Sequence, residues 1–222
     1  MIPDTVKEIR TRIAKVENSE IRNGLTAAYL FAARASEIVG VASASDTTTP
    51  YGPKGSDASI CPYTDGQITT EAAVFRLRTA KRKGLERFVA LPLKPEYEPL
   101  TRPLYEYFKA KGDGLAFEFT RQTLHAYAVQ TFVGLEYDIE RMNVNGNIRE
   151  RHKRDAAIHF LRHIRASELS WTYHFEPQEL ASYCGWTLRN AGYSQAMERY
   201  QILDWQGYFR KLLKPYYATN GE

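Results

Sequence analysis

The amino-acid sequence predicts a single α+β domain over residues 1–222, mainly α-helical with a small antiparallel β-sheet or hairpin. Apolar residues recur at helical spacing in most segments, whereas two short segments around a basic turn have the composition of β-strands. The hydrophobic content of 43% in 222 residues suffices for one substantial core. These observations favour one compact, mixed domain.

The composition also indicates a soluble protein of a reducing compartment. Cys61 and Cys184 are far apart and provide neither a disulfide framework nor a paired metal knuckle. The N-terminus lacks the apolar segment of a secretory signal, and no apolar stretch approaches the length of a membrane span. A cytoplasmic location without membrane contact is therefore expected.

The net charge is only +4, but the basic residues gather in two clusters. Such clusters are typical of surfaces that attract nucleic-acid phosphates, although a solvated charged face has the same composition. The first cluster contains Arg76, Arg78, Lys81, Arg82, Lys83 and Arg87, and the second contains Arg149, Arg151, Lys153, Arg154, Arg162 and Arg165.

The first forty residues are predicted to form two helices. Apolar residues at helical spacing begin near residue 3, Asn23-Gly24 predicts an interruption, and residues 25–39 resume as a strongly apolar helix. Arg34 lies within this apolar helix, where a charge requires a partner or a function.

A loop and a hairpin are predicted next. Residues 43–66 are rich in Thr, Ser, Pro, Gly and Asp, which predicts a long loop without regular structure. Residues 72–79 and 87–91 mix apolar and basic side chains and predict a β-hairpin with residues 81–84 at its tip.

The rest of the chain is predicted to be mainly helical. A short amphipathic helix is expected over residues 99–111 and another from about 120 to 132, whereas 138–147 is expected to be irregular. Three further helices are predicted over residues 155–169, 176–185 and 194–214.

The helix over residues 155–169 carries the most informative motif. His159 and Arg162 are three residues apart and His163 is one turn beyond His159, so all three lie on one face. A basic helix with two histidines is, on its own, more often a solvated surface. A zinc site is not expected, because the glutamate that follows the first histidine of a zincin helix is missing.

Taken in order, five features resemble the catalytic domain of the tyrosine recombinases, the phage-type integrase family, in particular its archaeal and viral members. The resemblance covers about residues 6–205 and implies the α+β fold of that domain. The features are Arg34 followed by Ser36-Glu37-Ile38, the basic hairpin, His159-Phe160-Leu161-Arg162-His163, Gly185-Trp186 and Arg199-Tyr200.

The resemblance implies that the protein breaks and rejoins DNA without a metal ion, ATP or another cofactor. Arg34 and Arg162 would clamp the scissile phosphate, because guanidinium groups offer paired donors and keep their charge. Tyr200 would attack the phosphorus and form a 3′-phosphotyrosyl link, with Tyr193 as the alternative nucleophile.

Proton transfer is assigned by the same resemblance. Lys81, or alternatively Lys83, would protonate the departing 5′ hydroxyl, and His159 would handle the proton of the nucleophile. Trp186 would donate its indole N–H to a phosphate oxygen. Two residues, Glu37 and His163, are expected to support this set.

The implied partner is double-stranded DNA, with a homotetramer in the synaptic complex and a monomer off DNA, at the nucleoid of a host cell. Family members usually carry an additional N-terminal DNA-binding domain, so this chain is expected to be a fragment or to rely on another module. Residues expected to contact DNA are Arg76, Arg78, Arg82, Arg151, Lys153 and Arg154.

Two alternatives remain open on the sequence. A type IB topoisomerase uses almost the same residues, and dependence on a defined sequence and on synapsis would distinguish it from a recombinase. A DNA-binding protein that has this fold without catalytic activity would bind DNA and form no covalent adduct.

Overall fold

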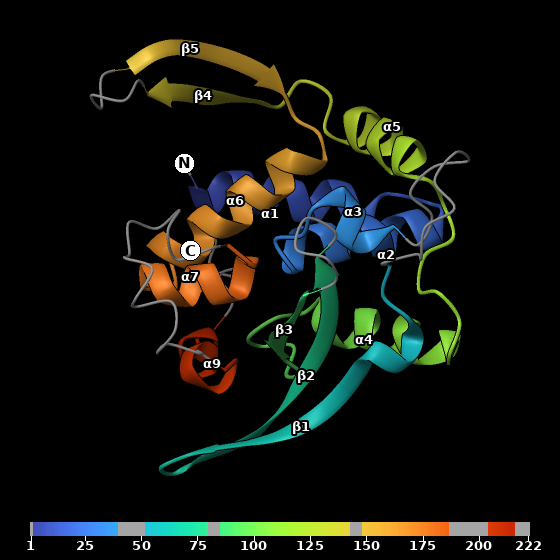
Figure 1. Ribbon diagram of the computed structural model, residues 1–222, viewed down its shortest axis with the longest axis vertical. Coiled ribbons are helices and arrows are strands. Elements are labelled where there is room, and N and C mark those ends of the chain that lie inside the picture. The colour runs from blue at the N-terminus through green and yellow to red at the C-terminus, as the bar shows by residue number, and fades with distance from the viewer. Residues whose placement is uncertain (1, 40–51, 80–84, 143–147, 187–203, 216–222) are drawn as a thin grey trace.

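The computed structural model describes residues 2–39, 52–79, 85–142, 148–186 and 204–215 (Figure 1). Helices make up the larger part of its regular structure, beside a three-stranded antiparallel sheet and a two-stranded ribbon. The predicted α+β class is therefore confirmed. None of the described helices is long and apolar enough to cross a membrane.

The N-terminal segment forms α1 (Ile2–Ala14), α2 (Ser19–Leu30) and the short α3 (Ala35–Ile38). The interruption predicted at Asn23-Gly24 is wrong, because the chain breaks before α2, where the Asn18 side chain accepts a hydrogen bond from the N–H of Ile21 at 3.0 Å. Gly24 lies inside α2, and a Cβ there would stand 2.5 Å from the ring of Phe119. This glycine permits close packing rather than a turn.

The sheet consists of β1 (Ala58–Asp65), β2 (Ile68–Thr79) and β3 (Leu85–Pro92), in that order and all antiparallel, after a 3-10 turn, η1 (Gly55–Asp57). The predicted hairpin is confirmed as β2 and β3. The long loop predicted over 43–66 is wrong for 58–65, which form β1. Only Ala58 and Tyr63 of this strand are buried, so no clear hydrophobic alternation identifies it.

The middle of the chain forms α4 (Thr101–Lys111) and α5 (Arg121–Thr131), close to the predicted bounds. Two further strands, β4 (Glu136–Met142) and β5 (Ile148–Asp155), pair as an antiparallel ribbon. The irregular structure predicted over 138–147 is therefore wrong for 138–142. In β4, Tyr137 and Ile139 alternate with acidic residues, a short strand signal that the prediction of irregular structure overlooked, whereas β5 is almost entirely charged.

The C-terminal part forms α6 (Ile158–Trp171), α7 (Pro177–Cys184) and α9 (Gln206–Leu212). The predicted opening of α7 at Glu176-Pro177 is confirmed, and Gly185 ends it in the left-handed conformation, at φ 65°. Of the last predicted helix, residues 206–212 are helical, whereas 194–203 lie outside the described residues.

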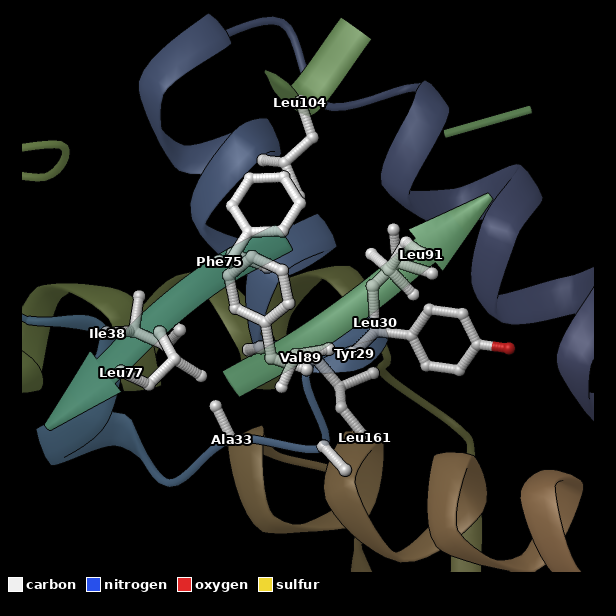
Figure 2. Packing of buried hydrophobic residues seen from close by; sticks show 14 of the residues in the cluster. Tyr29, Leu30, Ala33, Ile38, Phe75, Leu77, Val89, Leu91, Leu104 and Leu161 are labelled. Carbon is white, nitrogen blue, oxygen red and sulfur yellow. The ribbon is translucent and has the colours of Figure 1, made fainter. Parts of the chain in front are cut away.

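Helices α1, α2, α3 and α6 lie together on one side of the sheet, with α4 beside β1 and β2, and α7 and α9 flank β3 (Figure 1). The β4–β5 ribbon lies beyond α6, at the opposite end of the molecule from the turn of β1 and β2. Figure 2 shows the core between these layers. It includes Tyr29 and Leu30 from α2, Phe75 and Leu77 from β2, Val89 and Leu91 from β3, Leu104 from α4 and Leu161 from α6.

Candidate active site

A pocket of about 410 Å³ brings five of the predicted site residues together. They come from three segments that are distant in the sequence: the residue before α3, the face of α6 that carries His159 and Arg162, and the chain just after α7. The described residues that line it are Arg34, His159, Arg162, His163, Ala166, Ser167, Ser170, Trp171 and Trp186.

Arg34 is placed by the turn that separates α2 from α3. It caps α3 in an extended conformation, and its N–H donates to Glu37 Oε2 at 2.9 Å. Ala32 in the same turn has a φ of 45°, a left-handed conformation that costs a residue with a Cβ about 1 kcal/mol. The carbonyl of this strained residue accepts a hydrogen bond from Arg162. The strained turn therefore contributes directly to the position of both predicted phosphate-clamping arginines.

Glu37 holds three guanidinium groups around one buried carboxylate. Its Oε1 lies 3.2 Å from Arg34 Nη1, and its Oε2 lies 3.0 Å from Arg87 Nη2 and 3.6 Å from Arg162 Nη1. Burial would raise the pKa of Glu37, but Arg87, the N–H of Arg34 and Arg162 together lower it below the ordinary value. The carboxylate is therefore ionised at neutral pH, and the cluster keeps a net positive charge.

Arg162 is almost entirely buried behind the pocket surface. Its Nη2 donates to the carbonyl of Cys184 at 2.7 Å, its Nη1 donates to Ala32, and its guanidinium lies 5.6 Å from the ring centroid of Trp186. Burial lowers the pKa of Arg162 to about 10, so the side chain is still charged at neutral pH. Its orientation is thus determined by two backbone carbonyls and an indole ring.

Arg87 is the third arginine around Glu37, and the sequence indicated no role for it at the site beyond its place in a basic cluster. Its Nη2 donates to the carbonyl of Phe31 at 3.1 Å and its Nη1 to that of Tyr183, so Arg87 and Arg162 join the same two chain segments. A signal for its burial was present, because strand alternation places Arg87 on the face of the buried Val89 and Leu91.

The two histidines lie on the exposed side of α6. Desolvation by the surrounding protein lowers the pKa of His163 below its ordinary value, so that this imidazole is neutral at neutral pH. A neutral imidazole can accept a proton as well as donate one. The pocket therefore combines cationic groups with a side chain suited to proton transfer.

Two of the residues predicted to contact DNA have ion-pair partners within the fold. Arg76 lies 2.6 Å and Arg78 2.9 Å from the carboxylate of Asp57, which is buried, and both are 3.6 Å from Glu86. Burial would raise the pKa of Asp57, but hydrogen bonds from Arg78, the N–H of Lys54 and Arg76 lower it. Both arginines thus connect β2 to η1.

The remaining predicted site residues are in β5 or outside the described ranges. Register sets Arg151 opposite Glu140, Lys153 opposite Asp138 and Arg154 opposite Tyr137. Outside the described residues lie Lys81, Arg82, Lys83, Tyr193 and Tyr200. Within the described ranges, no group of three or more His, Cys, Asp or Glu side chains is arranged to hold a metal ion.

Compared with known proteins, the chain matches no family model, and the searches of curated proteins and of solved structures give no match either.

Proposed function

We propose that the protein is a site-specific DNA recombinase or integrase that cleaves and rejoins DNA through a 3′-phosphotyrosyl intermediate, without a metal ion or ATP. The supporting observation is the common pocket of Arg34, His159, Arg162, His163 and Trp186, since these side chains come from three separate segments. Two arginines at one pocket suit the charge that develops on a phosphodiester during displacement.

The proposed reaction conserves the energy of the phosphodiester bond. The Tyr200 oxygen attacks the phosphorus, a tyrosyl–phosphorus bond forms, and the bond to the 5′ oxygen breaks as that oxygen takes up a proton. His159 accepts the proton of the tyrosine, and Lys81 supplies the proton of the leaving group. Attack by a 5′ hydroxyl reverses these steps and releases the tyrosine.

The nucleophile can be identified with a library of nicked suicide duplexes of random sequence, because loss of a short leaving strand traps the covalent intermediate. The wild-type protein should form a denaturant-resistant adduct in the presence of a chelator. Tyr200→Phe should abolish the adduct, whereas Tyr193→Phe should retain it. An adduct that persists in Tyr200→Phe and disappears in Tyr193→Phe would assign the reaction to Tyr193.

One observation favours a second candidate, a DNA-binding protein that does not cleave. Arg162 already donates to the carbonyls of Ala32 and Cys184, which leaves fewer of its donors for a phosphate. The same experiment separates the candidates, because this protein would bind the duplexes and form no adduct with any of them. A type IB topoisomerase would form adducts and relax supercoiled DNA without synapsis.

A further inference from the structure

The pocket extends along α6 beyond the residues of the proposed active site. Its second half is lined by Ala166, Ser167, Ser170 and Trp171, which follow His163 on the same helical face. Ala166 and the two serines have small side chains, and Trp171 is the last of these four residues along α6. The proposed function uses none of these four residues.

Trp171 is the last residue of α6, and 74% of its surface is exposed. A single exposed apolar residue is common on protein surfaces, so the exposure alone indicates no ligand. Here, however, the indole lines the same pocket as Arg34 and Arg162. Its large ring and its N–H are suited to a ligand that has both apolar and polar parts.

The charge of the pocket favours an anionic ligand. None of the described residues that line the pocket is acidic, and the carboxylate of Glu37 is buried behind it. Ser167 and Ser170 contribute hydroxyl groups, which can donate hydrogen bonds to phosphate oxygens. The pocket is thus cationic at one end and offers hydroxyl and indole donors at the other.

The distance along α6 between Arg162 and Trp171 corresponds to a short stretch of one DNA strand. The helical rise places Trp171 about 13 Å from Arg162 along the axis of α6. Because successive phosphates of one strand are farther apart than the rise of about 3.4 Å per base pair along the duplex axis, this distance spans fewer than about four nucleotides. A strand whose phosphate lies at Arg34 and Arg162 can therefore reach the indole within a few nucleotides.

We propose that Trp171, with Ser167 and Ser170, binds the sugar-phosphate backbone of duplex DNA within a few nucleotides of the scissile phosphate. The indole packs on a deoxyribose, and the serine hydroxyls donate to the adjacent phosphate. This inference rests on the proposed function, because the proposed phosphate site places the DNA strand in the pocket. The contact is independent of base sequence and adds affinity outside the reacting residues.

The test measures non-covalent binding to a labelled duplex of about 20 base pairs by fluorescence anisotropy. Trp171→Ala should weaken binding about tenfold, as expected if the indole and the sugar remove roughly 55 Å² of apolar surface from water. Trp171→Phe should keep most of the affinity. Val133→Ala is the matched control, since Val133 is 72% exposed and does not line this pocket, and it should bind as the wild type.

Salt dependence separates an apolar contact from a charged one. Because the indole carries no charge, Trp171→Ala should keep the wild-type slope of log Kd against log salt concentration, whereas Arg34→Ala should reduce it. Unchanged affinity in Trp171→Ala would overturn the inference. If the affinity is unchanged and sedimentation shows that Trp171→Ala has a different oligomeric state, the surface around Trp171 is instead a contact between copies of the chain.

Failure of this inference is distinguishable from failure of the proposed function, because binding is measured without cleavage. If the wild type forms no adduct but Trp171→Ala binds the duplex more weakly than the wild type, the DNA contact is supported and the recombinase is rejected. If the wild type forms adducts and Trp171→Ala binds the duplex as tightly as the wild type, only the Trp171 contact is rejected and the recombinase is not.

Discussion

At the scale of single residues, the buried carboxylate of Glu37 determines where three arginine side chains lie. Arg34 and Arg162 belong to the candidate phosphate site, whereas Arg87 extends from β3 and contacts the same carboxylate. The side chain of Glu37 is 1% exposed, so water cannot replace it as a partner. Loss of this one charge would leave two buried guanidinium groups, those of Arg87 and Arg162, without a compensating charge.

Substitution of Glu37 by glutamine keeps the shape of the side chain and removes its charge. We expect Glu37→Gln to lower the free energy of unfolding by about 3 kcal/mol, since one partner of a buried ion pair is lost. Urea unfolding measures this change. Glu86→Gln is the control, because the side chain of Glu86 is 43% exposed and lies 3.6 Å from Arg76 and Arg78, so its loss should cost less than about 1 kcal/mol. Equal losses in the two variants would contradict this account of Glu37.

At the scale of elements, a close contact between η1 and the end of α4 positions the start of the sheet. A Cβ on Gly55 would stand 2.3 Å from the carbonyl oxygen of Phe108 and 2.6 Å from that of Gly112. The N–H of Gly55 also donates to the carbonyl of Gly114 at 3.0 Å. Because these atoms belong to the backbone, no side-chain rotation can relieve the overlap.

The substitution Gly55→Ala is therefore expected to separate η1 from α4 and to lower the free energy of unfolding by about 2 kcal/mol, as overpacking does in other cores. Thermal unfolding followed by circular dichroism measures the loss. Gly66→Ala serves as the comparison, since Gly66 has open space around it and a φ of 59°. It should cost only about 1 kcal/mol. A Gly55→Ala protein as stable as Gly66→Ala would contradict the expected overlap between η1 and α4.

At the scale of the whole molecule, a buried network of charged and phenolic groups joins α1, α2, α6 and the turn before α4. Arg10 donates to both carboxylate oxygens of Glu98, at 2.6 and 2.7 Å, and Arg165 Nη1 lies 2.6 Å from Glu168. The Tyr29 hydroxyl donates to Glu168 at 2.6 Å. The network connects the helix of the candidate site to both N-terminal helices.

This network predicts how stability depends on pH. Burial would raise the pKa of Glu98, but Arg10 lowers it below the ordinary value of 4.5. The unfolded chain therefore binds protons at a higher pH than the folded protein does, and acid favours unfolding. We expect full stability above about pH 5 and a progressive loss below about pH 4.5.

The variant Glu98→Gln should be less stable at neutral pH, because Arg10 loses its charged partner, and its stability should decrease less steeply below pH 4.5. Denaturant unfolding between pH 3 and pH 7 tests both expectations. Glu96→Gln should show the wild-type dependence of stability on pH, since Glu96 is exposed and its ion pair with Lys94, at 4.0 Å, is long and solvated. A wild-type slope in Glu98→Gln would exclude Glu98 as a source of the pH dependence.

Local signals were sufficient for the elements that depend on neighbouring residues. Pro177 and Gly185 bound α7 as expected, and the β2–β3 hairpin follows from apolar and basic residues around a turn. The strands β1 and β4 were not predictable in the same way. Few residues of β1 are buried, and in β4 the alternation extends over only Tyr137 and Ile139, so pairing with a neighbouring strand defines both more than the hydrophobic period does.

The candidate site also combines features that local sequence determines with features that only the tertiary structure determines. The sequence alone determined the kinds of residue that suit a phosphodiester and their order along the chain, from Arg34 through His159 and Arg162 to Trp186. Only the tertiary structure decided that these residues share a pocket and that Glu37 and Arg87 lie behind it. Helix spacing follows from backbone geometry, whereas burial of a charge depends on partners that are distant in the sequence.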